Sequence, residues 1–266
     1  MPHSAFTIGK KYLAYRYRAL NGKGHGMHSP FVYDFIRQVL NDRQHDPAYD
    51  RVEALRKKLR SDHTEIEVLD FGAGSTKSGG NRRKISAIAR NAAKPAKYGQ
   101  LLMRIAKYYQ PQIILELGTS LGLSTSYLAL GNPAARILTL EGAPSIAAKA
   151  ASNFRELGLK NIQQVTGNFD DTLKDALSDL NKVDLAFIDG NHQLAPTLQY
   201  FNAILSRTHN DSILVFDDIH WSDEMEQAWE QIKKHPATRT SIDLFFVGIV
   251  FFRKEFHEVQ HFEVKY

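Results

Sequence analysis

From residue 112 onward, short apolar runs alternate with longer amphipathic stretches, and this rhythm predicts strands separated by helices. The apolar runs are 113–117, 136–141, 162–166, 183–189 and 212–217. The stretches with helical spacing are 124–130, 144–157, 170–180, 196–205 and 224–234. Apolar runs of this length between helices are typical of a mostly parallel sheet that helices cover on both faces.

The chain ends with two further apolar runs, 241–246 and 248–253, which have almost no connection between them. Such a short connection fits an antiparallel hairpin and not a parallel crossover. We therefore predict an α/β fold with a Rossmann-like, seven-stranded, mostly parallel sheet that closes with an antiparallel C-terminal hairpin.

The first part of the chain has a different pattern, which predicts a mostly helical N-terminal extension. Residues 1–62 favour helices, with a start at Ser29 and Pro30 and a second helix over 47–59. A short strand over 66–70, a glycine-rich loop, a basic helix over 83–93 and a helix over 99–109 follow. We divide the chain into an extension or lid, residues 1–97, and a cofactor-binding domain, residues 98–266.

Composition narrows the class of protein. The 266 residues are 43% hydrophobic and 24% charged and contain no cysteine, which excludes disulfides, thiolate metal sites and a cysteine nucleophile. No apolar run approaches the roughly 18 residues of a membrane span, and the N-terminus lacks a secretory core. We expect a cytoplasmic protein without a membrane partner.

Charge is unevenly distributed along the chain. No acid precedes Asp34, and nine lysines and arginines but no acid lie between Asp70 and Glu116. A basic segment over 77–107 fits either an RNA or phosphate partner or a solvated helical face. Both interpretations stay open at this stage.

The chemistry begins at the sequence ELGTSLGLS, which follows the run over 113–117. Gly118 and Gly122 permit a sharp turn and the close approach of a ligand, with Thr119 and Ser120 between them. Dinucleotide sites usually have G-x-G-x-x-G spacing. Here the spacing is G-x-x-x-G, and Glu116 before it would repel a diphosphate but attract the cationic amino acid end of S-adenosylmethionine.

Two later strand ends complete the predicted cofactor site. Glu141, followed by Gly142, is placed to accept both ribose hydroxyls. Asn168 and Phe169 follow the third strand and are placed to reach and stack on the adenine. The alternative for the last pair is purely structural, with Asp170 as a helix cap and Phe169 in the core.

A second acid–glycine motif, DFGAGS over 70–75, competes with the first one. A lysine- and arginine-rich segment follows it, and no second strand that ends in an acid comes before Glu116. We therefore favour the Glu116 motif for the cofactor and place the 70–75 loop near the cofactor or the methyl acceptor.

Acids also end the fourth and fifth strands. Asp189 precedes His192, and Asp217 and Asp218 precede His220 and Trp221. The carboxyl ends of parallel strands form the ligand-binding edge of such sheets. Asp189, Asp217 and Asp218 are candidate Mg²⁺ ligands, and His192 is a candidate general base. The structural alternatives are a capping carboxylate and an exposed loop histidine.

These motifs, from KYG at residue 97 through ILELGTSLGLST, TLEG, VDLAFIDGNH and VFDDIH, resemble the class I S-adenosylmethionine-dependent O-methyltransferases. The resemblance is to the metal-dependent catechol-type group and the related bacterial sugar and antibiotic-tailoring branch, over about 60% of the chain. It implies cofactor positions at Glu116, Gly118, Ser120, Glu141 and Asn168, with Asp189 beside the cofactor. It also implies metal positions at Asp189, Asp217 and Asp218. His192 occupies the general-base position, where the catechol enzymes carry lysine, and Asp218 stands where they usually carry asparagine.

The sequence thus favours methyl transfer from S-adenosylmethionine to a hydroxylated small molecule, with Mg²⁺ assistance. Two alternatives stay open: an RNA methyltransferase that uses the basic segment, and a non-catalytic nucleotide-binding domain. The apolar stretch FFVGIVFF over 245–252 is a candidate edge for pairing in a homodimer. His25, His28 and Tyr33 are candidates for a lid, and His220 and Trp221 for the lining of the acceptor pocket.

Overall fold

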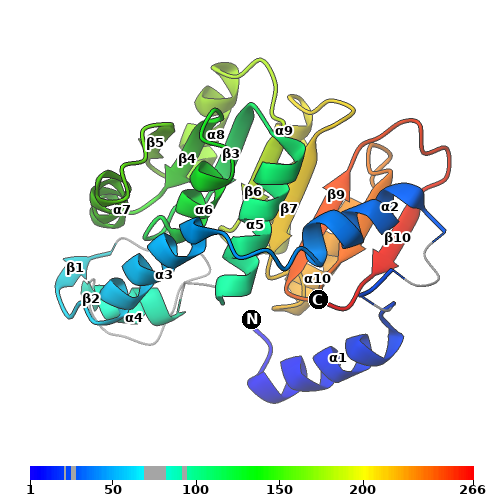
Figure 1. Ribbon diagram of the computed structural model, residues 1–266, viewed down its shortest axis with the longest axis horizontal. Coiled ribbons are helices and arrows are strands. Elements are labelled where there is room, and N and C mark those ends of the chain that lie inside the picture. Colours follow the sequence, from blue (N-terminus) through cyan, green and yellow to red (C-terminus); the bar gives the residue numbers. More distant parts are fainter. Residues whose placement is uncertain (21, 25–27, 69–81, 92–94) are drawn as a thin grey trace. The chain divides into compact units, whose positions relative to one another are not determined.

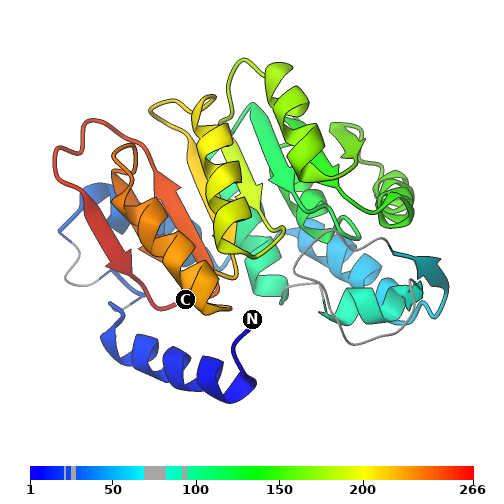
Figure 2. The same ribbon diagram turned by 180° about the vertical axis from the view of Figure 1, so that it is seen from behind.

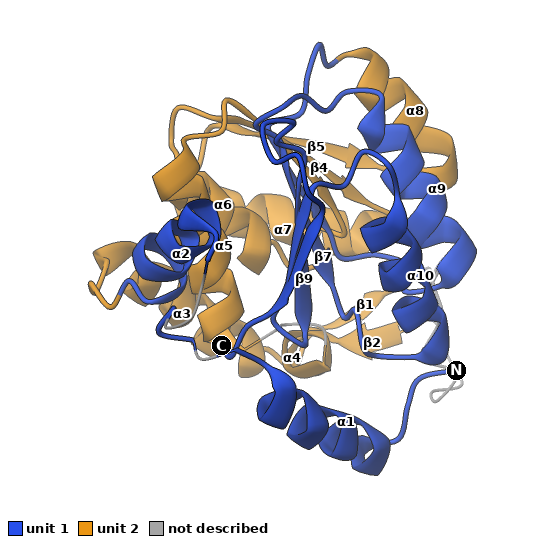
Figure 3. Ribbon diagram, turned by 90° about the vertical axis from the view of Figure 1, so that its right-hand side faces the viewer, with its two compact units in different colours: residues 1–42, 180–266 blue, residues 43–179 orange. Residues whose placement is uncertain are grey.

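The computed structural model describes all residues except 21, 25–27, 69–81 and 92–94 (Figure 1). The chain forms two compact units (Figure 3). Unit 1 contains residues 1–42 and 180–266, and unit 2 contains residues 43–179. These units do not follow the division at residue 97 that the sequence favours, because N-terminal residues pack with the last third of the chain.

Unit 2 contains the first half of the strand–helix alternation. Its elements are α3 (Pro47–Arg60), β1 (Glu65–Glu67), β2 (Arg82–Lys84), α4 (Ile85–Asn91), α5 (Ala96–Tyr109), β3 (Ile113–Leu117), α6 (Leu123–Gly131), β4 (Arg136–Glu141), α7 (Pro144–Glu156), β5 (Ile162–Thr166) and α8 (Phe169–Ser178). Strand β4 lies between β3 and β5 and is parallel to both. Helices α5 and α6 cover one face of these strands (Figure 1), and α8 lies on the other (Figure 2).

Unit 1 joins the N-terminal helices to the closing strands. Its elements are α1 (Ala5–Arg18), α2 (Pro30–Phe35), the π-helix η1 (Ile36–Leu40), β6 (Leu185–Ile188), α9 (Leu194–Leu205), β7 (Ile213–Asp217), α10 (Asp223–Lys234), β8 (Thr240–Asp243), β9 (Val247–Phe251) and β10 (Gln260–Glu263). The strand order is β10-β8-β9-β7-β6. Helix α2 covers one face of these strands (Figure 1), and α9 and α10 cover the other (Figure 2).

Strand directions confirm the predicted Rossmann-like class. The pairs β3–β4, β4–β5, β6–β7 and β8–β10 are parallel, whereas β9 is antiparallel to both β7 and β8. The predicted hairpin is therefore β8–β9. Strand β10 was not predicted, because its sequence QHFE has no apolar run.

Two sequence predictions need correction. The basic helix expected over 83–93 begins only at Ile85, because Arg82–Lys84 pair with β1 as the antiparallel strand β2. The stretch over 245–252 is not a free edge for a dimer, because β9 lies between β7 and β8 and its backbone bonds are used on both sides. In addition, none of the described helices is long and apolar enough to cross a membrane.

Gly122, the N-cap residue of α6, is closely packed against a neighbouring side chain. Gly122 has φ of 80°, and a Cβ at this position would lie 2.4 Å from Cε1 of Phe154. Gly158 has a similar φ of 69°, but a Cβ there would meet nothing within 4 Å. A side chain at either position would strain the backbone, but only a side chain at Gly122 would also overlap with a neighbour.

We expect Gly122→Ala to lower the free energy of unfolding by about 2–4 kcal/mol, from left-handed strain plus overpacking. Gly158→Ala should cost only the strain, about 1–2 kcal/mol. Urea unfolding of the two variants measures both values. Equal losses would show that the Phe154 ring moves aside without cost.

Candidate functional site

The turn after β3 has the backbone shape that the sequence predicts. Gly118, Ser120 and Gly122 all have left-handed conformations, with φ of 100°, 47° and 80°. The amides of Gly118 and Thr119 donate to the carbonyl of Leu140 in β4, at 3.0 and 3.1 Å. The turn is thereby fixed at the carboxyl ends of β3 and β4, where parallel sheets bind ligands.

Glu141, the last residue of β4, is bound to this turn. One carboxylate oxygen accepts from the amide of Ser120 at 2.8 Å, and the other accepts from the amide of Ala143 at 3.0 Å, across Gly142. A carboxylate has about four acceptor positions in all, so it can serve several donors at once. The side chain is half-buried and oriented, as a receptor for a pair of hydroxyls must be.

Glu116 has a more interior environment than the sequence indicated. The side chain is fully buried and accepts from the hydroxyl of Thr139 at 2.6 Å and from the hydroxyl of Thr125. Thr119 joins the group through a bond of 2.6 Å to Thr139. Glu116 thus links β3, β4 and α6, and its direct contact with a cofactor remains a prediction.

Asn168 and Phe169 begin helix α8. The Asn168 side chain accepts from the amide of Asp170 at 3.3 Å, so Asn168, and not Asp170, is the N-cap. Both Asn168 and Phe169 are half-buried, and Phe169 is not among the fully buried core residues. The amide of Gly167 donates to the Glu141 carbonyl at 2.9 Å, which fixes this loop beside the end of β4.

In unit 1, Asp189, His192 and Trp221 lie together beyond β6 and β7. Nε2 of His192 is 3.4 Å from Oδ1 of Asp189, and both side chains are about one-fifth exposed, at 23% and 21%. The imidazole of His192 lies 5.5 Å from the Trp221 ring, centroid to centroid. An oriented, partly open imidazole is the group that proton transfer to or from a ligand requires.

Backbone strain gathers around the same residues. Asn191, His192 and Asp218 have φ of 65°, 22° and 55°, values that residues other than glycine rarely adopt. Such strained positions cluster at binding and catalytic sites, because the surrounding fold must hold them. The strain marks these two loops independently of any motif.

The candidate metal ligands differ in environment. Asp217 ends β7 and is 1% exposed, whereas Asp218 is half-buried and donates its amide to the carbonyl of Phe246 at 2.8 Å. All three residues are described in the structure, but their carboxylate oxygens do not all lie within 4.8 Å of one another. Their oxygens suit Mg²⁺, but the side chains are not gathered around one point, so metal binding there stays a prediction.

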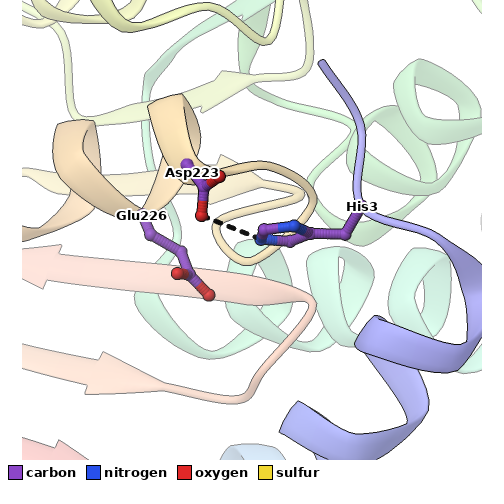
Figure 4. A group of neighbouring side chains, drawn as sticks. All are labelled: His3, Asp223 and Glu226. Carbon is purple, nitrogen blue, oxygen red and sulfur yellow. Dashed lines mark ion pairs between the residues drawn. The ribbon is translucent and has the colours of Figure 1, made fainter.

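A group that does meet this distance criterion is His3, Asp223 and Glu226 (Figure 4). Nε2 of His3 lies 3.6 Å from Oδ1 of Asp223. Glu226, however, already binds Lys11 Nζ at 2.6 Å and His220 Nδ1 at 3.0 Å. Two neighbouring cationic groups oppose a metal ion, so the group serves to attach the N-terminal segment to α10.

His220 is the residue whose role the sequence did not reveal. Its ring nitrogens bind Glu226 at 3.0 Å and Asp243 at 2.9 Å, and its ring stacks on Phe245 at 5.0 Å. The Trp229 indole also donates to Asp243, at 3.1 Å. His220 therefore supports the loop that carries Asp218 and Trp221, and both of its nitrogens are engaged away from an acceptor.

This network predicts a pH-dependent contribution to stability. Burial alone lowers the pKa of His220, but the Asp243 and Glu226 carboxylates outweigh it, so the pKa lies above its ordinary value of 6.5. Because the folded pKa is raised, the stabilisation is complete below 6.5 and is lost as pH rises through the raised pKa. We expect His220→Gln to lower the melting temperature most at pH 6 and least at high pH.

Melting curves from pH 6 to pH 9 measure this difference. The control is His257→Gln, because His257 is exposed. A difference between wild type and His220→Gln that does not change with pH would contradict a charged His220 in this network.

Several predicted features fall outside these contacts. The loop over 70–75 and His25 lie outside the described residues. Tyr33 is 40% exposed, and its hydroxyl accepts from Arg37 at 3.3 Å. In the described part of the basic segment, Lys107 binds Asp46 at 2.8 Å and Arg104 is 8% exposed, so part of its charge serves internal packing.

The chain is similar in sequence to known methyltransferases. Residues 115–219 match the family model described as a methyltransferase domain. The catechol O-methyltransferase of Niastella koreensis is 33% identical over 124 residues, which are 46% of this chain and 55% of that protein. The catechol O-methyltransferase of Mycobacterium tuberculosis is 30% identical over 47% of this chain and 56% of its own length. The chain thus spans about half the length of these curated relatives.

Solved structures give the same fold. An O-methyltransferase from Bacillus cereus in complex with SAH has a TM-score of 0.58 and 19% identity, over 83% of this chain and 97% of its own. At this identity the likeness concerns the fold. Fold and family together define the class: the chain carries a class I S-adenosylmethionine-dependent methyltransferase domain. The recognition of that class from the sequence is confirmed.

Proposed function

We propose that this protein transfers the methyl group of S-adenosylmethionine to a hydroxyl group of a small molecule. The observation that supports it most is the Glu141 carboxylate, held 2.8 Å from the Ser120 amide beside three left-handed residues of the turn. A carboxylate that is held in place in this way is suited to accept from both hydroxyls of a ribose. The relatives named for catechol O-methylation support a hydroxylated acceptor.

The proposed roles divide between two sets of residues. Glu141 binds the ribose hydroxyls, the turn from Gly118 to Gly122 admits the amino acid end, and Asn168 with Phe169 contacts the adenine. When bound, the cofactor supplies a methyl group on a sulfonium, which is already a good leaving group. In the transfer, the sulfur–methyl bond breaks, an oxygen–methyl bond forms, and the acceptor hydroxyl loses its proton.

His192 is the proposed acceptor of that proton, and Asp189 orients its imidazole and stabilises the cation that forms. Trp221 lies beside His192 and is the proposed wall for an aromatic or other flat acceptor. We further propose that Mg²⁺ bound by Asp189, Asp217 and Asp218 assists the reaction, although the proton transfer to His192 does not require it. An acceptor screen in the presence of Mg²⁺ and in the presence of EDTA tests whether the metal contributes.

The first test is calorimetric titration of the folded protein with S-adenosylhomocysteine, with NAD⁺ as the control ligand. We expect micromolar binding of the first and none of the second. Absence of binding to both would overturn the proposal and favour a non-catalytic domain. Binding of RNA in a mobility assay at low salt, without methylation of small hydroxylated acceptors, would favour the RNA alternative.

Glu141→Ala tests the ribose contact. We expect it to weaken cofactor binding by about 1–3 kcal/mol, the range for losing charge-assisted hydrogen bonds. The control is Glu156→Ala, because Glu156 is an exposed carboxylate in the same unit that pairs with Lys58 at 2.7 Å. Unchanged affinity in Glu141→Ala, with the fold intact by circular dichroism, would remove Glu141 from the ribose.

A further inference from the structure

Helix α1 is attached to the rest of unit 1 through one of its faces. The Tyr12 and Tyr15 rings lie 5.0 and 5.3 Å from the Phe245 ring, and Lys11 binds Glu226 at 2.6 Å. The Tyr15 hydroxyl donates to the carbonyl of Val264. The position of the helix is therefore fixed, and its outer face is a permanent part of the surface.

That outer face is apolar. Phe6, Leu13 and Tyr17 are 73%, 71% and 92% exposed. Their spacing of seven and four residues puts them on one side of the helix, opposite to Tyr12 and Tyr15, over a length of about 16 Å. Of the eight large apolar side chains exposed in the described part of the chain, five belong to residues 1–20, with Met1 and Leu20 as the other two. Such a concentration marks an interaction surface.

The same face is positively charged. Helix α1 contains Lys10, Lys11, Arg16 and Arg18 and no acid. Lys11 and Arg18 pair with Glu226 and Glu263, but within the described residues neither Lys10 nor Arg16 has an ion pair. Lys10 lies over the Phe6 ring, 5.1 Å from its centroid, within this apolar outer face. A partner of the outer face must therefore be apolar and negatively charged.

We propose that the outer face of α1, formed by Phe6, Lys10, Leu13 and Tyr17 with Arg16 at its flank, binds the surface of an anionic lipid bilayer. Aromatic and leucine side chains beside basic residues are the composition of interfacial helices, which lie in the plane of the bilayer. A second copy fits poorly, because two such faces would bring like charges together. The outer face of a helix is also convex, so that a lipid interface can accept it without a matching groove.

This proposal changes one expectation from the sequence. The expectation of no membrane partner rested on the absence of a spanning apolar run, but an interfacial helix needs no such run. Because the site residues His192 and Trp221 belong to the same unit as α1, binding to a bilayer would bring that unit close to amphiphilic acceptors.

The test is co-sedimentation of the full chain with vesicles of phosphatidylcholine alone and of phosphatidylcholine with about 30% phosphatidylglycerol, because anionic lipid supplies the negative surface potential that attracts basic segments. We expect binding to the anionic vesicles that is at least about tenfold stronger than to the neutral ones and that weakens in 0.5 M NaCl, because salt screens the attraction. The triple variant Phe6→Ser, Leu13→Ser, Tyr17→Ser should lose most of this binding.

The matched control is Tyr108→Ser with Val259→Ser, which removes two exposed apolar side chains outside α1. The control should bind as wild type does, and circular dichroism and melting curves show whether each variant is folded. Absence of binding to anionic vesicles, or unchanged binding of a folded triple variant, would overturn the proposal. Self-association that the triple variant abolishes, without vesicle binding, would overturn it in favour of a second copy.

Discussion

Replacement of His192 by asparagine is expected to lower turnover by about 10²–10⁴-fold, the usual contribution of a positioned general base. The imidazole lies 3.4 Å from Asp189 and 5.5 Å from Trp221, in a strained loop at the end of β6. Steady-state rates of the wild type and the variant at one fixed pH measure this loss once an acceptor is found.

The matched control is His209→Asn. His209 forms another imidazole–carboxylate pair in unit 1, with Asp184 at 2.8 Å, and precedes β7 instead of following β6. We expect the control to keep turnover within about twofold of wild type, because ligands bind at the carboxyl ends of the strands. A similar loss in both variants would show that these imidazoles act through folding and not through proton transfer.

Asp189→Ala is expected to lower turnover by at least about 10²-fold while cofactor affinity stays within a few fold. Removing the carboxylate frees the His192 ring and leaves the imidazolium without its counter-charge. Asp184→Ala is the control, because Asp184 and Asp189 flank opposite ends of the same strand and each faces a histidine. Full activity of Asp189→Ala would exclude both the orienting and the metal-binding role.

The double variant separates these two roles. If Asp189 acts only through His192, adding Asp189→Ala to His192→Asn should cost little further activity, because residues that act as a unit are not additive. If Asp189 also binds Mg²⁺, the second substitution should cost a further 10–100-fold or so, and EDTA should abolish that difference. Rates of the four proteins with Mg²⁺ and with EDTA complete the cycle.

Local patterns determined a large part of this protein. Apolar runs predicted where the strands lie along the chain, and the short connection between 241–246 and 248–253 predicted the antiparallel hairpin. Gly118 and Gly122 gave the left-handed turn, because few other residues adopt this backbone cheaply. Glu141 lies where its strand end predicts, beside that turn. These features depend on neighbours within a few residues, which a sequence displays directly.

Only the tertiary structure decided which distant side chains meet. Glu116 binds Thr125 and Thr139, and His220 binds Asp243, 23 residues later in the chain. The strand Arg82–Lys84 and the edge strand β10 form because β1 and β8 offer free backbone partners, although neither segment has a strand pattern. Hydrogen bonds of this kind carry no periodic signature, because the two partners lie on separate elements. The sequence therefore determines the class of fold and the turn at the cofactor site, whereas packing decides which carboxylates are buried, paired or open to a ligand.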